Sequence, residues 1–186
     1  LRGGGAERVC LNLANNFVER GWSVDMLLME RTGDLLPLLD QRVNVIELRA
    51  SRMLGVTQPL IRYLRRARPR SLVANMWPLT SIAVLARAWA RSPTRLVLVE
   101  HTTLSKSEIR KSPLHFLALR ISMRMLAPFA DARVTVSEGV ADDLARSTGL
   151  PREAFSTIYN PIVQGVPPRR DALLGGGSLG IPLILN

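Results

Sequence analysis

Three short apolar segments, each followed by a helical pattern, constrain the fold of this chain more than any other feature. Each segment is rich in Leu, Val and Ala and is typical of a strand covered on both faces of a sheet. The strands are predicted at residues 71–75, 95–100 and 132–136, and the helices that follow them at 79–91, 113–127 and 138–147. Regular alternation of this kind builds a parallel sheet with crossover helices.

The alternation continues on both sides of these segments. A helix is predicted after three glycines at the start of the chain, and a second one at 57–68. Further strands are predicted at 22–29, 43–48 and 156–159. We therefore predict an α/β fold, a doubly wound, Rossmann-like parallel sheet of roughly six or seven strands with helices on both faces.

Length and composition indicate one domain with a linker behind it. A chain of 186 residues that is 47% hydrophobic can bury one sizeable core. We assign residues 1–163 to this domain and expect its first strand, which should lead into the glycines, to be missing. Residues 164–180 are rich in Pro, Arg and Gly and read as a linker, and residues 181–186 resemble the first strand of a truncated second domain.

Gly3, Gly4 and Gly5 directly precede the first helix. Glycines let a backbone approach a ligand closely, and a helix start offers unpaired N–H groups and a partial positive charge. This combination is typical of an anion-binding corner. A plain loop with a helix cap remains the alternative.

Polar and aromatic side chains follow the central strands, at the edge where doubly wound sheets bind ligands. His101 and Thr102 come after one strand, and Ser137 and Glu138 after the next. Trp77 follows a third strand and offers a flat surface for a sugar or a base. Each has a structural alternative: a histidine that closes a turn, a serine cap with an acidic first turn, and a core tryptophan.

Composition excludes several classes of function. Two histidines and the absence of a suitable carboxylate pair leave no metal set and no nucleophilic triad, so we expect neither a metal nor a cofactor. Cys10 is the only cysteine, which excludes an internal disulfide and fits a reducing cytoplasm. The longest apolar runs are too short to cross a bilayer.

Five short motifs occur along the chain in the same order as in a known family. They lie at residues 3–8, 21–24, 100–102, 136–140 and 158–162. Together they resemble the amino-terminal domain of the large retaining glycosyltransferase family four, which is one half of a GT-B fold. The resemblance covers residues 1–163.

The resemblance implies a retaining, hexosyltransferase-type enzyme that moves a sugar from a nucleotide-sugar to a lipid-linked or saccharide acceptor. Cell-envelope polysaccharide or glycolipid synthesis is the setting that we expect. The family's glycine loop, which approaches the sugar donor, corresponds to Gly3, Gly4 and Gly5. The histidine that contacts the transferred sugar corresponds to His101. The family's Ser-Glu segment at the cleft corresponds to Ser137 and Glu138, and the Asn-Pro step before the linker begins at Asn160. We add Trp77 and Thr102 to the expected cleft and acceptor residues because they follow strands at the same edge. Without the nucleotide-binding domain, the chain alone should not turn over substrate.

The formal charge of +10 comes mostly from arginine and favours an anionic partner. Arg62, Arg65 and Arg66 lie opposite the apolar face of the helix at 57–68. Lys106, Arg110 and Lys111 precede the helix at 113–127. We expect these residues to face an anionic membrane, with the protein cytoplasmic and peripheral on the inner face of the membrane. An ordinary solvated basic surface is the alternative.

Other functions stay open at this point. A sugar-nucleotide epimerase of the same fold would share the glycine loop but normally needs more carboxylates at the cleft. A non-catalytic basic module could bind anionic lipid or nucleic acid with the same arginines. We do not expect nucleic acid as a partner, because the chain has no aromatic strand platform and no docking motif for it.

Overall fold

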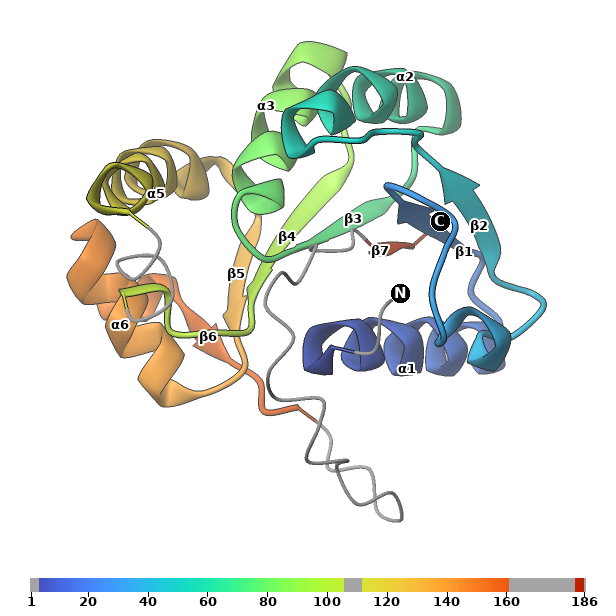
Figure 1. Ribbon diagram of the computed structural model, residues 1–186, viewed down its shortest axis with the longest axis horizontal. Helices are drawn as coiled ribbons and strands as arrows, with labels where there is room; N and C mark the ends of the chain where they lie inside the picture. The colour runs from blue at the N-terminus through green and yellow to red at the C-terminus, as the bar shows by residue number, and fades with distance from the viewer. Residues whose placement is uncertain (1–3, 106–111, 161–182, 186) are drawn as a thin grey trace.

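A single sheet runs through the computed structural model, which describes residues 4–105, 112–160 and 183–185. Helices lie on both of its faces (Figure 1). The described strands are β1 (Val24–Leu28), β2 (Asn44–Glu47), β3 (Ser71–Asn75), β4 (Arg95–Glu100), β5 (Ala132–Thr135), β6 (Ser156–Thr157) and β7 (Leu183–Leu185). The α-helices are α1 (Gly5–Glu19), α2 (Thr57–Ala67), α3 (Leu79–Ala90), α5 (Pro113–Leu126) and α6 (Glu138–Thr148). Short 3-10 turns are η1 (Leu36–Leu38), η2 (Met53–Val56), η3 (Ala127–Phe129) and η4 (Arg152–Ala154).

The strand order is β2-β1-β7-β3-β4-β5-β6. β3, β4, β5 and β6 pair in parallel, and β1 pairs in parallel with β2. This is the order of a doubly wound fold, with β7 at the position that the first strand of such a fold normally takes. The predicted fold class is therefore confirmed, and the predicted strands and helices agree with the structure to within two residues at most ends.

β7 is the exception to the parallel arrangement. It pairs antiparallel with β1 on one side and with β3 on the other. The sequence predicted a strand over 181–186, and residues 183–185 form one inside this sheet. The assignment of 181–186 to a second domain and of 1–163 to the first stays a prediction, and the linker at 164–180 lies outside the described residues.

The larger core lies between the sheet and the helices α2, α3, α5 and α6. Strand residues such as Leu72, Leu96 and Leu98 are buried against Leu64 of α2 and Leu119 of α5. Figure 1 shows these helices following one another around one side of the sheet. The face of each helix that the sequence pattern marked as apolar is the face that packs here.

A smaller core joins α1 to the other face of β1. Leu11, Ala14 and Val18 of α1 pack against Val24 and Met26. Figure 1 shows α1 on the side of the sheet opposite α2 and α3. All five residues of β1 are buried, because the strand has a helix on each face.

A buried polar contact fastens α2 to the edge of the sheet. The carboxylate of Asp25 on β1 accepts hydrogen bonds from the hydroxyl of Tyr63 on α2 and from Nδ2 of Asn44 on β2, the latter at 2.8 Å. Burial, together with this bond to Asp25, raises the pKa of Tyr63 well above its usual range. The contact thus satisfies a carboxylate that is only 8% exposed.

We predict that Tyr63→Phe lowers the free energy of unfolding by about 1.5–3 kcal/mol, because it removes a hydrogen bond to a buried carboxylate. Tyr159→Phe is the matched control, since Tyr159 is 66% exposed. Urea unfolding followed by circular dichroism measures both variants. Equal midpoints for Tyr63→Phe and the wild-type chain would show that this bond adds nothing to stability.

Candidate functional site

The residues singled out from the sequence gather at one edge of the sheet. β3, β4 and β5 are parallel neighbours, so their carboxyl ends lie side by side and lead into Met76, His101 and Val136. α1 begins at the same edge, because it ends next to the start of β1 and β1 runs in the same direction as β3. The site therefore follows from strand direction alone.

The glycine corner, residues 3–5, is not an anion-binding site formed by backbone N–H groups alone, because a carboxylate lies in it. The N–H of Gly4 donates to the carboxylate of Glu7 at 3.0 Å, and Glu7 is 6% exposed. This carboxylate occupies one backbone donor and places a negative charge at the corner. Gly5 is exposed, and a Cβ at this position would meet nothing within 4 Å, which leaves room for a ligand above the helix start. Gly3 lies outside the described residues.

His101 is held by the neighbouring strand. Its Nε2 lies 3.0 Å from Oδ1 of Asn75, the last residue of β3. Because this oxygen is an acceptor, Nε2 carries the hydrogen and Nδ1 has a free lone pair. Nδ1 is buried and has no hydrogen-bond partner among the described residues. An unpaired buried nitrogen at the ligand edge of the sheet indicates a site for a hydroxyl or N–H of a ligand.

Burial also fixes the charge of His101. It lowers the pKa of the imidazole from 6.5 to about 4. The ring is therefore neutral at pH 7, and it can accept one hydrogen bond and donate another without carrying charge. Thr102, the next residue, is exposed at the same edge.

Glu100 organises the turn beside His101. It is 2% exposed, and its carboxylate accepts hydrogen bonds from the N–H of Trp77 at 3.3 Å and the hydroxyl of Thr80 at 3.1 Å. The turn also places Met76 at a φ of 65°. A buried carboxylate at the end of β4 thus holds the turn after β3 and the start of α3.

Trp77 points toward α5. Its indole N–H donates to the hydroxyl of Ser122 at 2.9 Å, and its ring meets His115 edge to face at 4.9 Å. The indole is half-buried and packs against the larger core. These contacts favour the packing alternative for Trp77, whose role in acceptor binding stays a prediction.

Ser137 and Glu138 open α6. The Ser137 hydroxyl accepts the N–H of Val140 at 3.3 Å and caps the helix, as the sequence suggested. Glu138 forms an ion pair with Arg152, which also binds Asp142 at 2.8 Å. Asn160 is exposed at the end of the described segment. The structure thus places these residues at the same edge of the sheet as His101. Among the described residues, no hydrogen bond joins them to His101.

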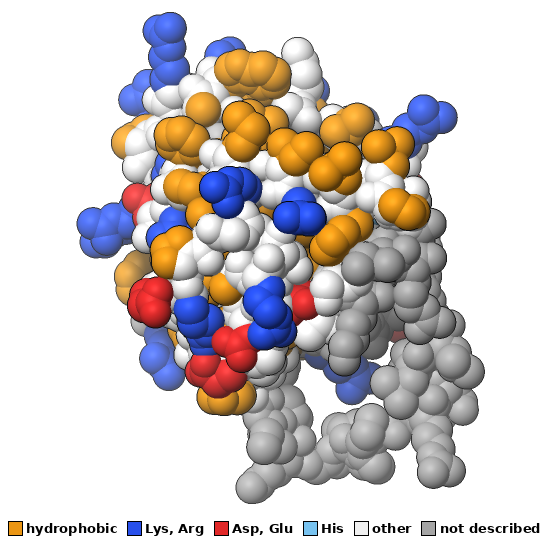
Figure 2. Space-filling view, turned by 90° about the vertical axis from the view of Figure 1, so that its left-hand side faces the viewer, with side chains coloured by type: hydrophobic (Ala, Val, Ile, Leu, Met, Phe, Trp, Pro, Cys, Tyr) orange, Lys and Arg blue, Asp and Glu red, His pale blue; other side chains and the backbone are white. Residues whose placement is uncertain are grey.

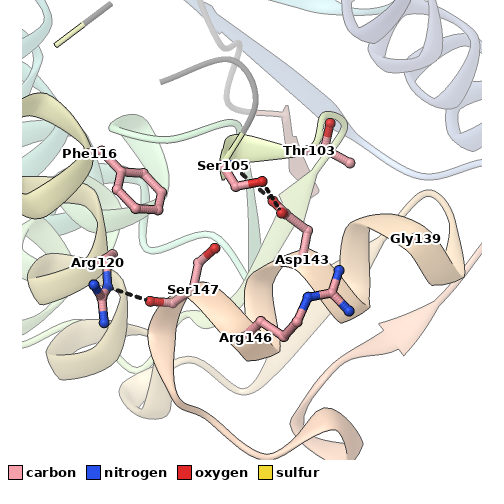
Figure 3. Close-up of a pocket in the computed structure, with 8 residues that line it drawn as sticks. All are labelled: Thr103, Ser105, Phe116, Arg120, Gly139, Asp143, Arg146 and Ser147. Carbon is pink, nitrogen blue, oxygen red and sulfur yellow. Dashed lines mark hydrogen bonds between the residues drawn. The ribbon is translucent and has the colours of Figure 1, made fainter. Parts of the chain in front are cut away.

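A pocket of about 550 Å³ opens between the loop after β4 and the helices α5 and α6 (Figure 3). On one wall, Asp143 is 6% exposed and accepts hydrogen bonds from the backbone N–H of Ser105, at 3.0 Å, and from its hydroxyl. The pocket is lined by Thr103, Ser105, Phe116, Arg120, Gly139, Asp143, Arg146 and Ser147.

Two arginines give this pocket its chemistry. Arg120 donates through Nε to the carbonyl of Ser147 at 2.8 Å, and it lies 6.0 Å from the ring centroid of Phe116. Arg146 is exposed and forms no hydrogen bond or ion pair with another residue of the described part of the chain. Asp143 keeps its negative charge while Ser105 donates to it, so the pocket presents two guanidinium groups and one carboxylate beside an aromatic ring and has a net positive charge. It suits a polar ligand that carries a negative charge.

Sequence analysis missed this pocket. Arg120 and Arg146 are far apart in the sequence, and no motif joins them to Ser105 and Asp143. The basic charge of the chain was the one available signal, and it does not tell which arginines share a pocket.

The arginines predicted to face a membrane are divided by the structure. Arg62 and Arg66 line a hollow beside β2, together with Glu47 and Arg49, whereas Arg65 reaches across to α3 and donates to the carbonyl of Trp89 at 2.8 Å. All three are exposed. Lys106, Arg110 and Lys111 lie outside the described residues.

The described residues offer no metal set and no transmembrane segment. No cluster of three or more His, Cys, Asp and Glu side chains is placed there to hold a metal ion. None of the described helices combines the length and the apolar character needed to cross a bilayer.

Comparison with known proteins finds one family. The family model described as Glycosyltransferase Family 4 matches residues 3–163, which include the glycine corner, His101 and the start of α6. No curated protein matches the chain. The resemblance seen in the sequence is thus confirmed at the level of the family.

The low pKa of His101 predicts a specific dependence of stability on pH. Because the folded value of about 4 lies below the unfolded value of 6.5, the unfolded chain binds the proton first as the pH falls. Stability should decline between pH 6.5 and about 4, by as much as about 3 kcal/mol from this group.

Thermal unfolding across this pH range measures the effect. His101→Gln should show a smaller decline than the wild-type chain. An identical decline in the two proteins would mean that protonation of His101 does not contribute to the pH dependence of stability.

Proposed function

The chain belongs to glycosyltransferase family 4, and we propose that it forms the acceptor-side half of a retaining enzyme that uses a nucleotide-sugar. A second domain, which holds the nucleotide, would face the edge of the sheet where His101 lies. The observation that carries the proposal is the neutral, partly unpaired imidazole of His101 at that edge.

His101 supports the proposal because its imidazole is neutral and can accept a hydrogen bond from a hydroxyl group. Asn75 holds Nε2–H at 3.0 Å, and Nδ1 keeps an unused lone pair. A sugar hydroxyl can donate to that nitrogen. Nδ1 is shielded in this structure, so the contact requires the segment at residues 101–105 to shift when the sugar binds. A charged imidazolium could not accept this bond, and burial prevents that charge at neutral pH.

The proposed reaction transfers the sugar with retention of configuration. The bond between the anomeric carbon and the donor phosphate oxygen breaks, and a bond forms to the acceptor oxygen. The acceptor hydroxyl proton passes to the leaving diphosphate, which departs with the nucleotide. In this scheme the chain orients the sugar through His101 and approaches the donor over Gly5, where no side chain intervenes.

The pocket between α5 and α6 is the proposed place for the polar part of the acceptor. Arg120 and Arg146 would neutralise a phosphate or a carboxylate there, and Phe116 would cover an apolar face of a sugar ring. We propose that the acceptor is lipid-linked or a saccharide, and that the setting is cell-envelope polysaccharide or glycolipid synthesis.

We predict that His101→Ala lowers kcat/KM of the two-domain enzyme at least tenfold, because a polar contact to the transferred sugar is typically worth about 1–3 kcal/mol. A coupled assay for released nucleoside diphosphate measures this loss. His115→Ala is the matched control and should retain activity. Loss of folded protein with unchanged specific activity of the remainder would assign His101 a purely structural role.

We also predict that the chain by itself releases no nucleotide from a panel of nucleotide-sugars, because the proposed nucleotide site lies on another domain. The two-domain enzyme serves as the positive control in the same assay. Release of nucleotide by the chain alone would contradict the proposal that the nucleotide site lies on another domain.

A further inference from the structure

The sheet has an open edge at β2. Among the described strands, β2 is the last one on this side and pairs only with β1 (Figure 1). The N–H of Leu48 donates to the carbonyl of Leu28, so Leu48 and, two residues earlier, Ile46 direct their backbone groups toward β1. Val45 and Glu47 therefore direct theirs away from the sheet, and no hydrogen bond joins these backbone groups to another described residue. An open edge of this kind can pair with a further strand.

A hollow of about 440 Å³ lies between this edge and α2. Asp25 holds its two sides together, because Tyr63 of α2 and Asn44 of β2 both donate to the Asp25 carboxylate. The hollow is therefore formed before a ligand binds, which lowers the entropic cost of binding. The residues that line it are Ile46, Glu47, Leu48, Arg49, Pro59, Arg62, Tyr63 and Arg66.

Three arginines line the hollow, and two of them are unpaired. Arg62 and Arg66 are exposed and form no hydrogen bond or ion pair with another residue in the described parts of the chain. Nε of Arg49 lies 3.8 Å from the carboxylate of Glu47, which also accepts the N–H of Arg31 at 3.2 Å. Glu47 is the one acidic residue among those that line the hollow. The hollow therefore has a net positive charge.

Other arginines of the chain have acidic partners. Figure 2 looks onto the side of the molecule where α5 and α6 lie and shows acidic side chains among the basic ones. Arg152, for example, pairs with Glu138 and with Asp142. No acidic residue occurs over positions 48–99, which include α2 and α3. The two unpaired arginines of α2 thus leave their charge for a ligand.

The spacing of these groups fits an extended peptide with acidic residues at alternate positions. Arg62 and Arg66 are four residues apart on α2, which separates them by about 6 Å along the helix. Alternate residues of a strand are about 6.6 Å apart and point to the same face. Ile46 and Leu48 point from β2 toward the larger core under α2, so alternate side chains of a strand added beside β2 would point to the same side. Two carboxylates of such a strand can therefore meet the two guanidinium groups.

We propose that an acidic, extended segment of a partner protein adds to the sheet beside β2, with alternate carboxylates paired to Arg62 and Arg66. Backbone hydrogen bonds to Val45 and Glu47 supply the strand pairing, and the guanidinium groups select for acidic side chains. A second copy of this edge fits poorly, because it would bring like charges together. A membrane surface would use the arginines but would leave the backbone groups of the edge unpaired. The proposal is independent of the transferase function.

Fluorescence anisotropy with the 186-residue chain tests the proposal. The probe is a labelled nonapeptide of alternating Glu and Val. It should bind at least tenfold more tightly than the same peptide with Gln in place of Glu. N-methylation of every second amide, in each of the two possible phases, should weaken binding at least tenfold in one phase, because it removes the donors that face β2.

Variants of the chain test the two arginines. Arg62→Gln/Arg66→Gln should lose at least tenfold in affinity for the Glu peptide. Arg20→Gln/Arg65→Gln is the matched control and should bind like the wild type. It removes the same charge, but Arg20 lies at the end of α1 and Arg65 donates to the carbonyl of Trp89 on α3. Circular dichroism verifies that each variant is folded.

Three results would overturn the proposal: equal binding of the Glu and Gln peptides, unchanged binding of both N-methylated peptides, or wild-type affinity of the Arg62→Gln/Arg66→Gln variant. Sedimentation with phosphatidylglycerol vesicles adds a fourth. Vesicle binding that depends on Arg62 and Arg66, without binding of the Glu peptide, would assign these arginines to a membrane surface instead.

Discussion

The parallel pairing of β3 with β4 is the constraint on which the candidate site depends. The register from Ser71 opposite Arg95 to Asn75 opposite Val99 brings the last residue of β3 beneath the residue that follows β4. His101 can therefore reach Asn75, and the buried carboxylate of Glu100 can hold the intervening turn. A shift of this register would separate the imidazole from its partner and change the protonation state and the orientation of the ring together.

The fold could be predicted from the sequence because its helices and strands have recognisable local patterns of apolar residues. Apolar strands such as 95–100 and helices with one apolar face such as 57–68 are defined by periodicity, and the pairing rules of parallel sheets then fix the edge on which His101, Ser137 and Gly5 lie. β7 was not predictable in this way, since its antiparallel place between β1 and β3 depends on pairing partners far away in the sequence.

The details of the site depend on contacts that no short motif encodes. The hydrogen bonds that Trp77 donates to Ser122 and that Ser105 donates to Asp143 join residues far apart in the sequence, whose proximity is set by tertiary packing. The bond that Gly4 donates to Glu7 is the exception, because these residues are the N-cap and the N3 position of α1. The pattern of α5 predicts a helix but not that several of its apolar side chains, such as Leu117 and Ile121, stay exposed. Polar residues at strand ends could thus be predicted as a group, whereas their individual partners could not.

The account places the transferred sugar against His101, above an open glycine corner. The most direct test is the structure of the two-domain enzyme with a nucleotide-sugar that it accepts in a turnover assay. The account predicts a sugar hydroxyl within about 3 Å of a ring nitrogen of His101 and the donor close to Gly5. A sugar bound elsewhere in the enzyme, with no ligand atom near the imidazole of His101, would contradict it.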